Sequence, residues 1–137
     1  MKKLGFENGS VVHARSRAKG AEWERHVKQF LETKGWVVTR WSNKVIDGEL
    51  RTAPTSRFNT KTGWPDFVAY GKNPDRGGPR FVTGIECKYA RYLRPEEKRM
   101  ASWLRANHIM DAVLVASKPK KNDDPEFKNE GVTFTNA

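Results

Sequence analysis

The stretch RFVTGIECK, residues 80–88, contains the pattern that decides the fold. Its β-branched and aromatic residues predict a strand, in which successive side chains point to opposite faces of a sheet. Glu86 and Lys88 therefore share one face, while Ile85 and Cys87 share the other. A carboxylate and an ammonium group are predicted to lie next to each other on the same surface of the sheet.

A second strand is predicted just before it, over residues 66–70, and the turn-rich residues 71–79 suit a hairpin between the two. In such a hairpin Asp66 can lie across from Glu86, and two converging carboxylates repel each other unless a cation lies between them. Oxygen ligands without a cysteine or histidine cluster favour Mg²⁺, with Mn²⁺ as a substitute, and argue against zinc. Lys88 would orient an attacking water or stabilise charge on a phosphate.

The other elements follow from apolar spacing. Trp23, Val27 and Leu31 form one stripe of an amphipathic helix, and Gly35 is a stop signal. In chain order we expect a helix over 17–34, strands over 36–41, 66–70 and 80–88, a helix over 95–107 and a strand over 111–116. The helical crossover makes the last two strands parallel. The predicted fold is a single α/β domain of order α-β-β-β-α-β, with a central mixed sheet flanked by helices.

A chain of 137 residues fits one domain. Residues 1–15 show no clear periodicity and are expected to be a mobile basic arm before a domain over 16–118. Within that domain, residues 42–64 are expected to be a long substrate-contacting loop, with a short hairpin around Asp47. Residues 119–137 are rich in Lys, Asn, Asp and Pro and are expected to be a peripheral tail.

Composition narrows the classes of function. The single cysteine, Cys87, excludes an internal disulfide and a multi-cysteine zinc site. Apolar stretches are too short for a membrane span or signal peptide, so we expect no membrane partner and a cytoplasmic location. A formal net charge of +10 predicts a polyanionic partner, with nucleic acid favoured over a mere solubility effect.

Two motifs carry a resemblance to a known family. Pro65-Asp66 followed by Glu86-Cys87-Lys88 resembles the signature of the PD-(D/E)XK nuclease superfamily, whose core has the same order of elements. More narrowly, the runs KGAEWER, residues 19–25, and LETKGWVV, residues 31–38, resemble the opening of the archaeal-type Holliday junction resolvases, which also occur in viruses.

This resemblance implies a metal-dependent, structure-selective DNA endonuclease, with a Holliday junction resolvase acting as a homodimer as the closest match. It also implies that the cytoplasm is that of a prokaryotic, archaeal or virus-infected cell. It implies catalytic roles for Glu24, Ser42, Asp66, Glu86 and Lys88. Asp66, Glu86 and the carbonyl of Cys87 would hold the metal, and Glu24 would complete the site directly or through water. Glu22 competes for that last role; being two positions away it faces elsewhere, so only one of the two can serve.

Branched or double-stranded DNA is the expected partner. Basic side chains near the site are candidates for binding it, namely Arg40, Lys44, Arg51, Arg57, Lys61, Arg91 and Arg94. Nearby aromatic residues that could stack on bases are Trp41, Trp64, Tyr89 and Tyr92.

Two alternatives stay open. The first is another nuclease of the superfamily, acting on flap or duplex DNA; residues 63–66 and 93–96 also resemble the VRR nucleases, although the glutamine usual in their second helix is absent. The second is a catalytically silent DNA-binding module, against which the intact Asp66, Glu86 and Lys88 count.

Overall fold

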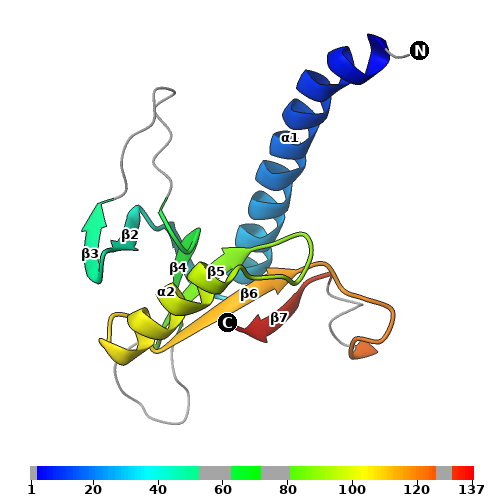
Figure 1. Cartoon of the computed structure of the whole chain (residues 1–137). Helices are drawn as coiled ribbons and strands as arrows, with labels where there is room; N and C mark the ends of the chain where they lie inside the picture. The colour runs from blue at the N-terminus through cyan, green and yellow to red at the C-terminus, as the bar shows by residue number, and fades with distance from the viewer. Residues whose placement is uncertain (1–2, 53–62, 72–80, 126–130) are drawn as a thin grey trace.

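A computed structural model describes residues 3–52, 63–71, 81–125 and 131–137, with side chains from Ala18 onward. Its main feature is a five-stranded sheet with strand order β1-β4-β5-β6-β7 (Figure 1). The strands are β1 (Val37–Arg40), β4 (Phe67–Gly71), β5 (Phe81–Cys87), β6 (Ala112–Ser117) and β7 (Thr133–Asn136). The helices are α1 (Lys3–Thr33) and α2 (Pro95–Ala106), and β2 (Asn43–Ile46) and β3 (Glu49–Thr52) form a separate hairpin.

The sheet is mixed, as the sequence predicted. The β4 strand pairs antiparallel with both β1 and β5. The helix α2 connects β5 to β6, which pair in parallel, and β7 adds an antiparallel edge. The predicted strand and helix bounds in this part of the chain are confirmed to within one residue. Within the described ranges, neither helix is long and apolar enough to cross a membrane.

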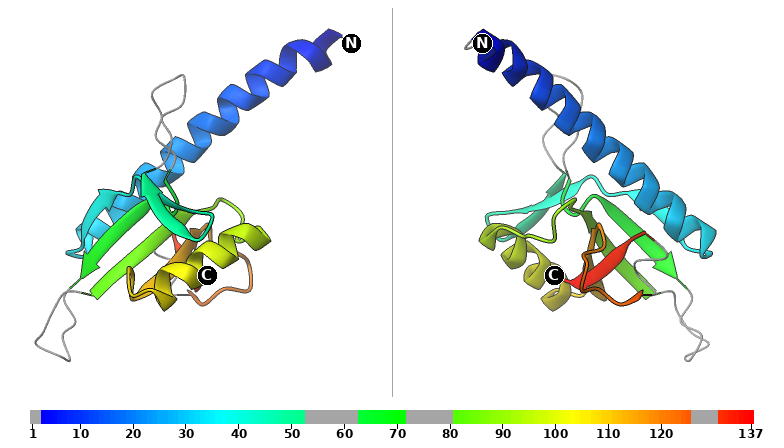
Figure 2. Two further views of the ribbon diagram at one scale, coloured as in Figure 1. Left: turned by 60° about the vertical axis from the view of Figure 1, so that its left-hand side comes forward. Right: turned by 90° about the vertical axis from the view of Figure 1, so that its right-hand side faces the viewer.

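The two helices cover opposite faces of the sheet (Figure 2). On one face, Trp23 and Val27 of α1 pack with the side chain of Ile85. On the other face, Leu104 of α2 packs with Val113. Alternation along each strand delivers one set of side chains to each core, and it also decides which polar residues of β5 lie beside which helix.

The first helix is longer than predicted. Residues 3–15 continue α1 as helix, so the expectation of a separate arm over residues 1–15 was wrong for this segment. Extending a helix costs far less than nucleating one, and a segment without an apolar stripe can continue a helix that is anchored elsewhere. Figure 1 shows this first part of α1 projecting beyond the sheet.

The hairpin suggested around Asp47 is confirmed. Asp47 and Gly48 both have positive φ, 51° and 74°, as a two-residue type I′ turn requires. Residues 43–52 are therefore ordered as β2 and β3, and the prediction of one long loop over 42–64 was too broad. Val45 and Leu50 of the hairpin pack against the α2 side of the core. The predicted DNA contacts Arg57 and Lys61 lie outside the described residues.

The expectation of a peripheral tail over 119–137 was wrong for its last part. Val132 is fully buried, and β7 closes one edge of the sheet. The Asp123 carboxylate accepts hydrogen bonds from the Thr133 hydroxyl and from Arg91, which fastens the segment after β6 to the domain. A four-residue strand among Lys, Asn and Pro residues leaves little periodic signal in the sequence.

Gly84 of β5 is a point of close approach. A Cβ atom there would lie 2.8 Å from Cγ of Pro65 and 2.5 Å from Sδ of Met110. We expect Gly84→Ala to lower the free energy of unfolding by about 1–3 kcal/mol through overpacking, measured by urea denaturation. Gly20→Ala in α1, where a Cβ would meet nothing within 4 Å, is the matched control and should be neutral or slightly stabilising. Equal effects of the two substitutions would contradict this packing.

Candidate active site

Asp66 and Glu86 converge between β4 and β5. The register places Phe67 opposite Ile85, so Asp66, one residue before β4, lies opposite Glu86. The backbone N–H of Cys87 donates a hydrogen bond of 2.8 Å to Oδ2 of Asp66 and holds that carboxylate in place. The strand alternation read from the sequence is thus confirmed, and it brings the two predicted acids together.

Neither carboxylate ionises easily in this position. Glu86 is only 6% exposed, and burial together with the charge of Asp66 raises the pKa of Glu86 to about 9. Burial also raises the pKa of Asp66, despite the hydrogen bond from Cys87. Oε1 of Glu86 is one of the buried side-chain atoms that have no hydrogen-bond partner in the described part of the chain. This is an acidic pair whose charge is poorly compensated by the protein itself.

Lys88 lies between two carboxylates. Its Nζ is 3.6 Å from Oε2 of Glu86 and 2.9 Å from Oε2 of Glu97, a residue in the first turn of α2. The ammonium group is therefore fixed beside the acidic pair, on the face of β5 that α2 covers. This confirms that Glu86 and Lys88 share a face, and it adds a second acid to the surroundings of the lysine.

Sequence reasoning missed Glu97 as part of the site. It is 1% exposed, and its carboxylate accepts hydrogen bonds from the Trp64 indole at 2.9 Å and from the Arg94 backbone N–H at 2.9 Å. Burial alone would raise its pKa, but these hydrogen bonds and Lys88 outweigh burial and lower the pKa to about 2. The available signal was its position two residues after Pro95 at a helix start, where an acid can bond back to the preceding backbone. Trp64 is buried, so its role is to hold Glu97 and not to stack on bases.

The structure distinguishes the two candidate glutamates of α1. Oε2 of Glu24 lies 3.1 Å from the guanidinium group of Arg40, and the charge of Glu24 helps to raise the pKa of Asp66. Glu22 instead lines a separate cavity on the surface. Glu24 is thus the α1 acid that lies near the pair, with Arg40 as its partner.

The other two predicted site residues are placed differently. The Cys87 side chain packs against the core beside α1, and burial raises the pKa of its thiol, so only its backbone is directed at the site. Ser42 follows β1 and lies against the backbone of Gly63. Among the described residues, no hydrogen bond joins the Ser42 hydroxyl to either carboxylate of the pair.

The predicted DNA-binding residues are dispersed around this site. Lys44 and Arg51 lie directly opposite each other on the β2–β3 hairpin, and Arg51 also pairs with Glu49 at 2.7 Å. Arg91 forms an ion pair with Asp123 and so connects the segment after β5 to the segment after β6. Arg94 is exposed and pairs with both acids of the first turn of α2.

A divalent cation fits the acidic pair. No group of three or more His, Cys, Asp or Glu side chains is arranged to hold a metal within residues 3–52, 63–71, 81–125 and 131–137. Mg²⁺, however, commonly keeps several waters and uses only one or two carboxylates. The unpartnered oxygen of Glu86 and the raised pKa values of the pair are what a cation between Asp66 and Glu86 would relieve.

The shifted pKa of Glu86 predicts how stability depends on pH. Between pH 4.5 and about 9 the folded protein keeps a proton on Glu86 that the unfolded chain releases, so stability falls as pH rises through this window. Glu86→Gln cannot ionise. In chelator it should raise the free energy of unfolding by at least about 1 kcal/mol near pH 8, and by much less near pH 5. Glu32 is exposed, and Glu32→Gln is the control. If the effect of Glu86→Gln did not depend on pH, it would contradict the burial of this charge.

Comparison of the chain with protein-family models, with curated protein sequences and with solved structures found no match in any of the three.

Proposed function

We propose that this protein is a metal-dependent DNA endonuclease. The observation that carries the proposal is the buried pair Asp66 and Glu86, facing each other across β4 and β5, with an unpartnered carboxylate oxygen and a lysine alongside. Burying two acids together is destabilising, and a purely structural role would be better served by apolar residues. The arrangement is understandable if a cation and a phosphate occupy the site.

The roles of the residues follow from their placement. Asp66 and Glu86 would hold Mg²⁺, with the Cys87 carbonyl as a further ligand; when bound, the metal makes a nucleophile available near neutral pH and offsets charge on the phosphate. Lys88 would hold the attacking water or donate to a phosphate oxygen, and the ion pair with Glu97 would keep its ammonium group in position. Glu24 would act at the edge of the site, with Arg40 balancing its charge.

The charge distribution supports DNA as the substrate. The net charge of +10 favours a polyanion, and Lys44 lies opposite Arg51 on the hairpin, where two basic side chains stand together although Arg51 also pairs with Glu49. The hairpin packs on the α2 side of the core, and Lys88 and Glu97 lie on that same side of the sheet. A DNA backbone lying along the hairpin would reach toward the acidic pair.

We propose Holliday junctions as the substrate within this activity. The support is the resemblance of residues 19–25, 31–38 and 85–88 to the archaeal-type resolvases. Cutting a junction requires two nicks related by a two-fold axis, which a homodimer with one acidic site per subunit would make.

The acidic site is tested by substitution. Asp66→Asn, Glu86→Gln and Lys88→Ala should each reduce cleavage of a labelled four-way junction by at least about a hundredfold, because each removes a group that acts on the metal, the water or the phosphate. Binding of the uncut junction in Ca²⁺ should change little. Glu24→Gln should also impair cleavage, with Glu22→Gln as its matched control. Undiminished cleavage by Glu86→Gln, or by the wild type in excess chelator, would overturn the proposal.

The hairpin is tested by salt dependence. If Lys44 and Arg51 each neutralise one phosphate, replacing both with Ala should reduce the log–log salt slope of duplex DNA binding by about 1.8, at about 0.9 per phosphate. The double variant should also lose preference for a four-way junction over linear duplex in a gel cleavage assay. Lys121→Ala, an exposed lysine after β6, is the control. An unchanged slope would remove the hairpin from the interface, and equal cutting of junction, flap and duplex by the wild type would refute the junction assignment.

A further inference from the structure

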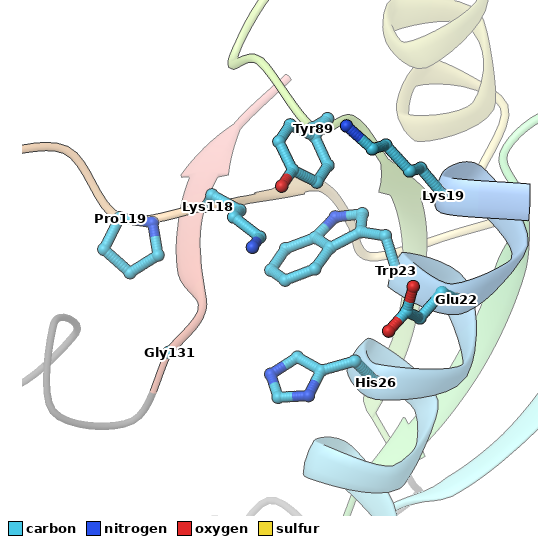
Figure 3. Close-up of a pocket in the computed structure, with 8 residues that line it drawn as sticks. All are labelled: Lys19, Glu22, Trp23, His26, Tyr89, Lys118, Pro119 and Gly131. Atoms are coloured by element: carbon cyan, nitrogen blue, oxygen red, sulfur yellow. The ribbon is translucent and has the colours of Figure 1, made fainter. Parts of the chain in front are cut away.

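A second cavity lies on the α1 side of the sheet. Its volume is about 650 Å³, and α1, the end of β5 and the segments after β6 and before β7 all contribute to it (Figure 3). The lining residues are Lys19, Glu22, Trp23, His26, Tyr89, Lys118, Pro119 and Gly131. None of the roles proposed above for the acidic site uses this cavity.

The floor of the cavity is formed by Trp23, which is anchored in the core. Trp23 is 5% exposed, and its indole N–H donates a hydrogen bond of 3.1 Å to the carbonyl of Ala116 in β6. The His26 ring is stacked on Trp23 with a centroid distance of 5.3 Å. The Trp23 part of the floor is thus anchored in the core, and preformed cavities are typical of ligand sites.

The wall of the cavity consists of the exposed Tyr89 ring and nearby lysine side chains. Tyr89 is 53% exposed and meets the edge of Trp23 at 6.0 Å between centroids. The ammonium group of Lys118 lies over the Tyr89 ring at 4.8 Å, and in Figure 3 the Lys19 and Lys118 side chains flank that ring. Glu22 lies across Trp23 from Tyr89. The part of the cavity around Tyr89 is therefore both aromatic and positively charged.

At two points of the chain, one residue contributes to the cavity and its neighbour in sequence contributes to the acidic site. On α1, Trp23 forms the floor while Glu24 lies near Asp66. After β5, Lys88 faces the acidic pair while Tyr89 faces the cavity. Neighbouring residues thus build both places, with the Lys88 and Tyr89 side chains directed to opposite sides of the chain.

We propose that this cavity binds one nucleotide unit of a single DNA strand, with its base on the Tyr89 ring and its phosphate between Lys19 and Lys118. That this nucleotide belongs to DNA rests on the function proposed above. Stacking of a base on an aromatic ring is a stronger interaction than an exposed cation–π contact. A base can therefore displace the Lys118 ammonium from the ring, and the lysine then pairs with the phosphate.

The test uses a fluorescein-labelled single-stranded hexamer of thymidine, titrated in Ca²⁺ and followed by anisotropy. Tyr89→Ala should weaken binding about tenfold, since a lost stack of about 1.4 kcal/mol is a factor of ten. Tyr89→Phe keeps the ring and should bind within about twofold of the wild type. Phe81→Ala is the matched control, because Phe81 is an exposed aromatic residue at the start of β5 and does not line the cavity. Lys118→Ala should reduce the salt slope by about 0.7.

Two results would overturn the proposal: hexamer binding by Tyr89→Ala within about twofold of the wild type, or an equal loss for Phe81→Ala. Competition by thymidine monophosphate tests whether the cavity takes a nucleotide that is part of a strand or a free nucleotide. The hexamer should bind at least about tenfold more tightly, because further phosphates add to it. Equal affinity would mean that the cavity takes a free nucleotide and would overturn the strand assignment.

Cleavage measured in parallel separates this proposal from the nuclease proposal. If the wild type cuts no DNA but Tyr89→Ala loses hexamer binding, the cavity stands as a nucleotide site and the nuclease assignment falls. If the wild type cuts DNA and Tyr89→Ala binds the hexamer normally, the nuclease assignment stands and the nucleotide site falls. Thermal melts of each variant check that the fold is retained.

Discussion

Asp66 and Glu86 lie opposite each other, and both carboxylates are poorly solvated. Most other polar groups of the site hold or balance these two acids. The Cys87 amide holds one carboxylate, Lys88 approaches the other, and Glu97 holds the lysine in place. All of this depends on the register between β4 and β5, because a slip of one residue would turn every side chain of one strand to the other face.

The β5 strand also divides the protein into two chemical environments. Its residues that face α2 lead to the acidic pair and the lysine, while its other face supplies Ile85 and Cys87 to the core beside α1. The chain leaves β5 at Lys88 and Tyr89, one on each side. The central strand thus supplies both the candidate chemistry and the wall of the neighbouring cavity.

Local patterns predicted those parts of the structure that depend on local geometry. Strand alternation placed Glu86 and Lys88 on one face, and the Asp47-Gly48 pair marked a turn that only residues tolerating positive φ adopt easily. Glu97 escaped prediction as a site residue because its partners, Trp64 and Lys88, are brought to it only by tertiary packing. The β7 strand escaped because four residues carry too little periodic signal, and the start of α1 because residues 3–15 have no apolar stripe.

The first helix contributes to both sites through Trp23 and Glu24, two consecutive residues, and it is anchored in the core by Val27 and Leu31. Each residue added to a helix rotates what precedes it by about 100°. A single insertion or deletion between residues 24 and 27 would therefore turn both functional side chains away together. Length changes near the start of α1, which lies beyond the sheet, would leave them in place (Figure 1). Related sequences should accordingly vary in length before residue 19 and keep a constant spacing from Trp23 to Leu31.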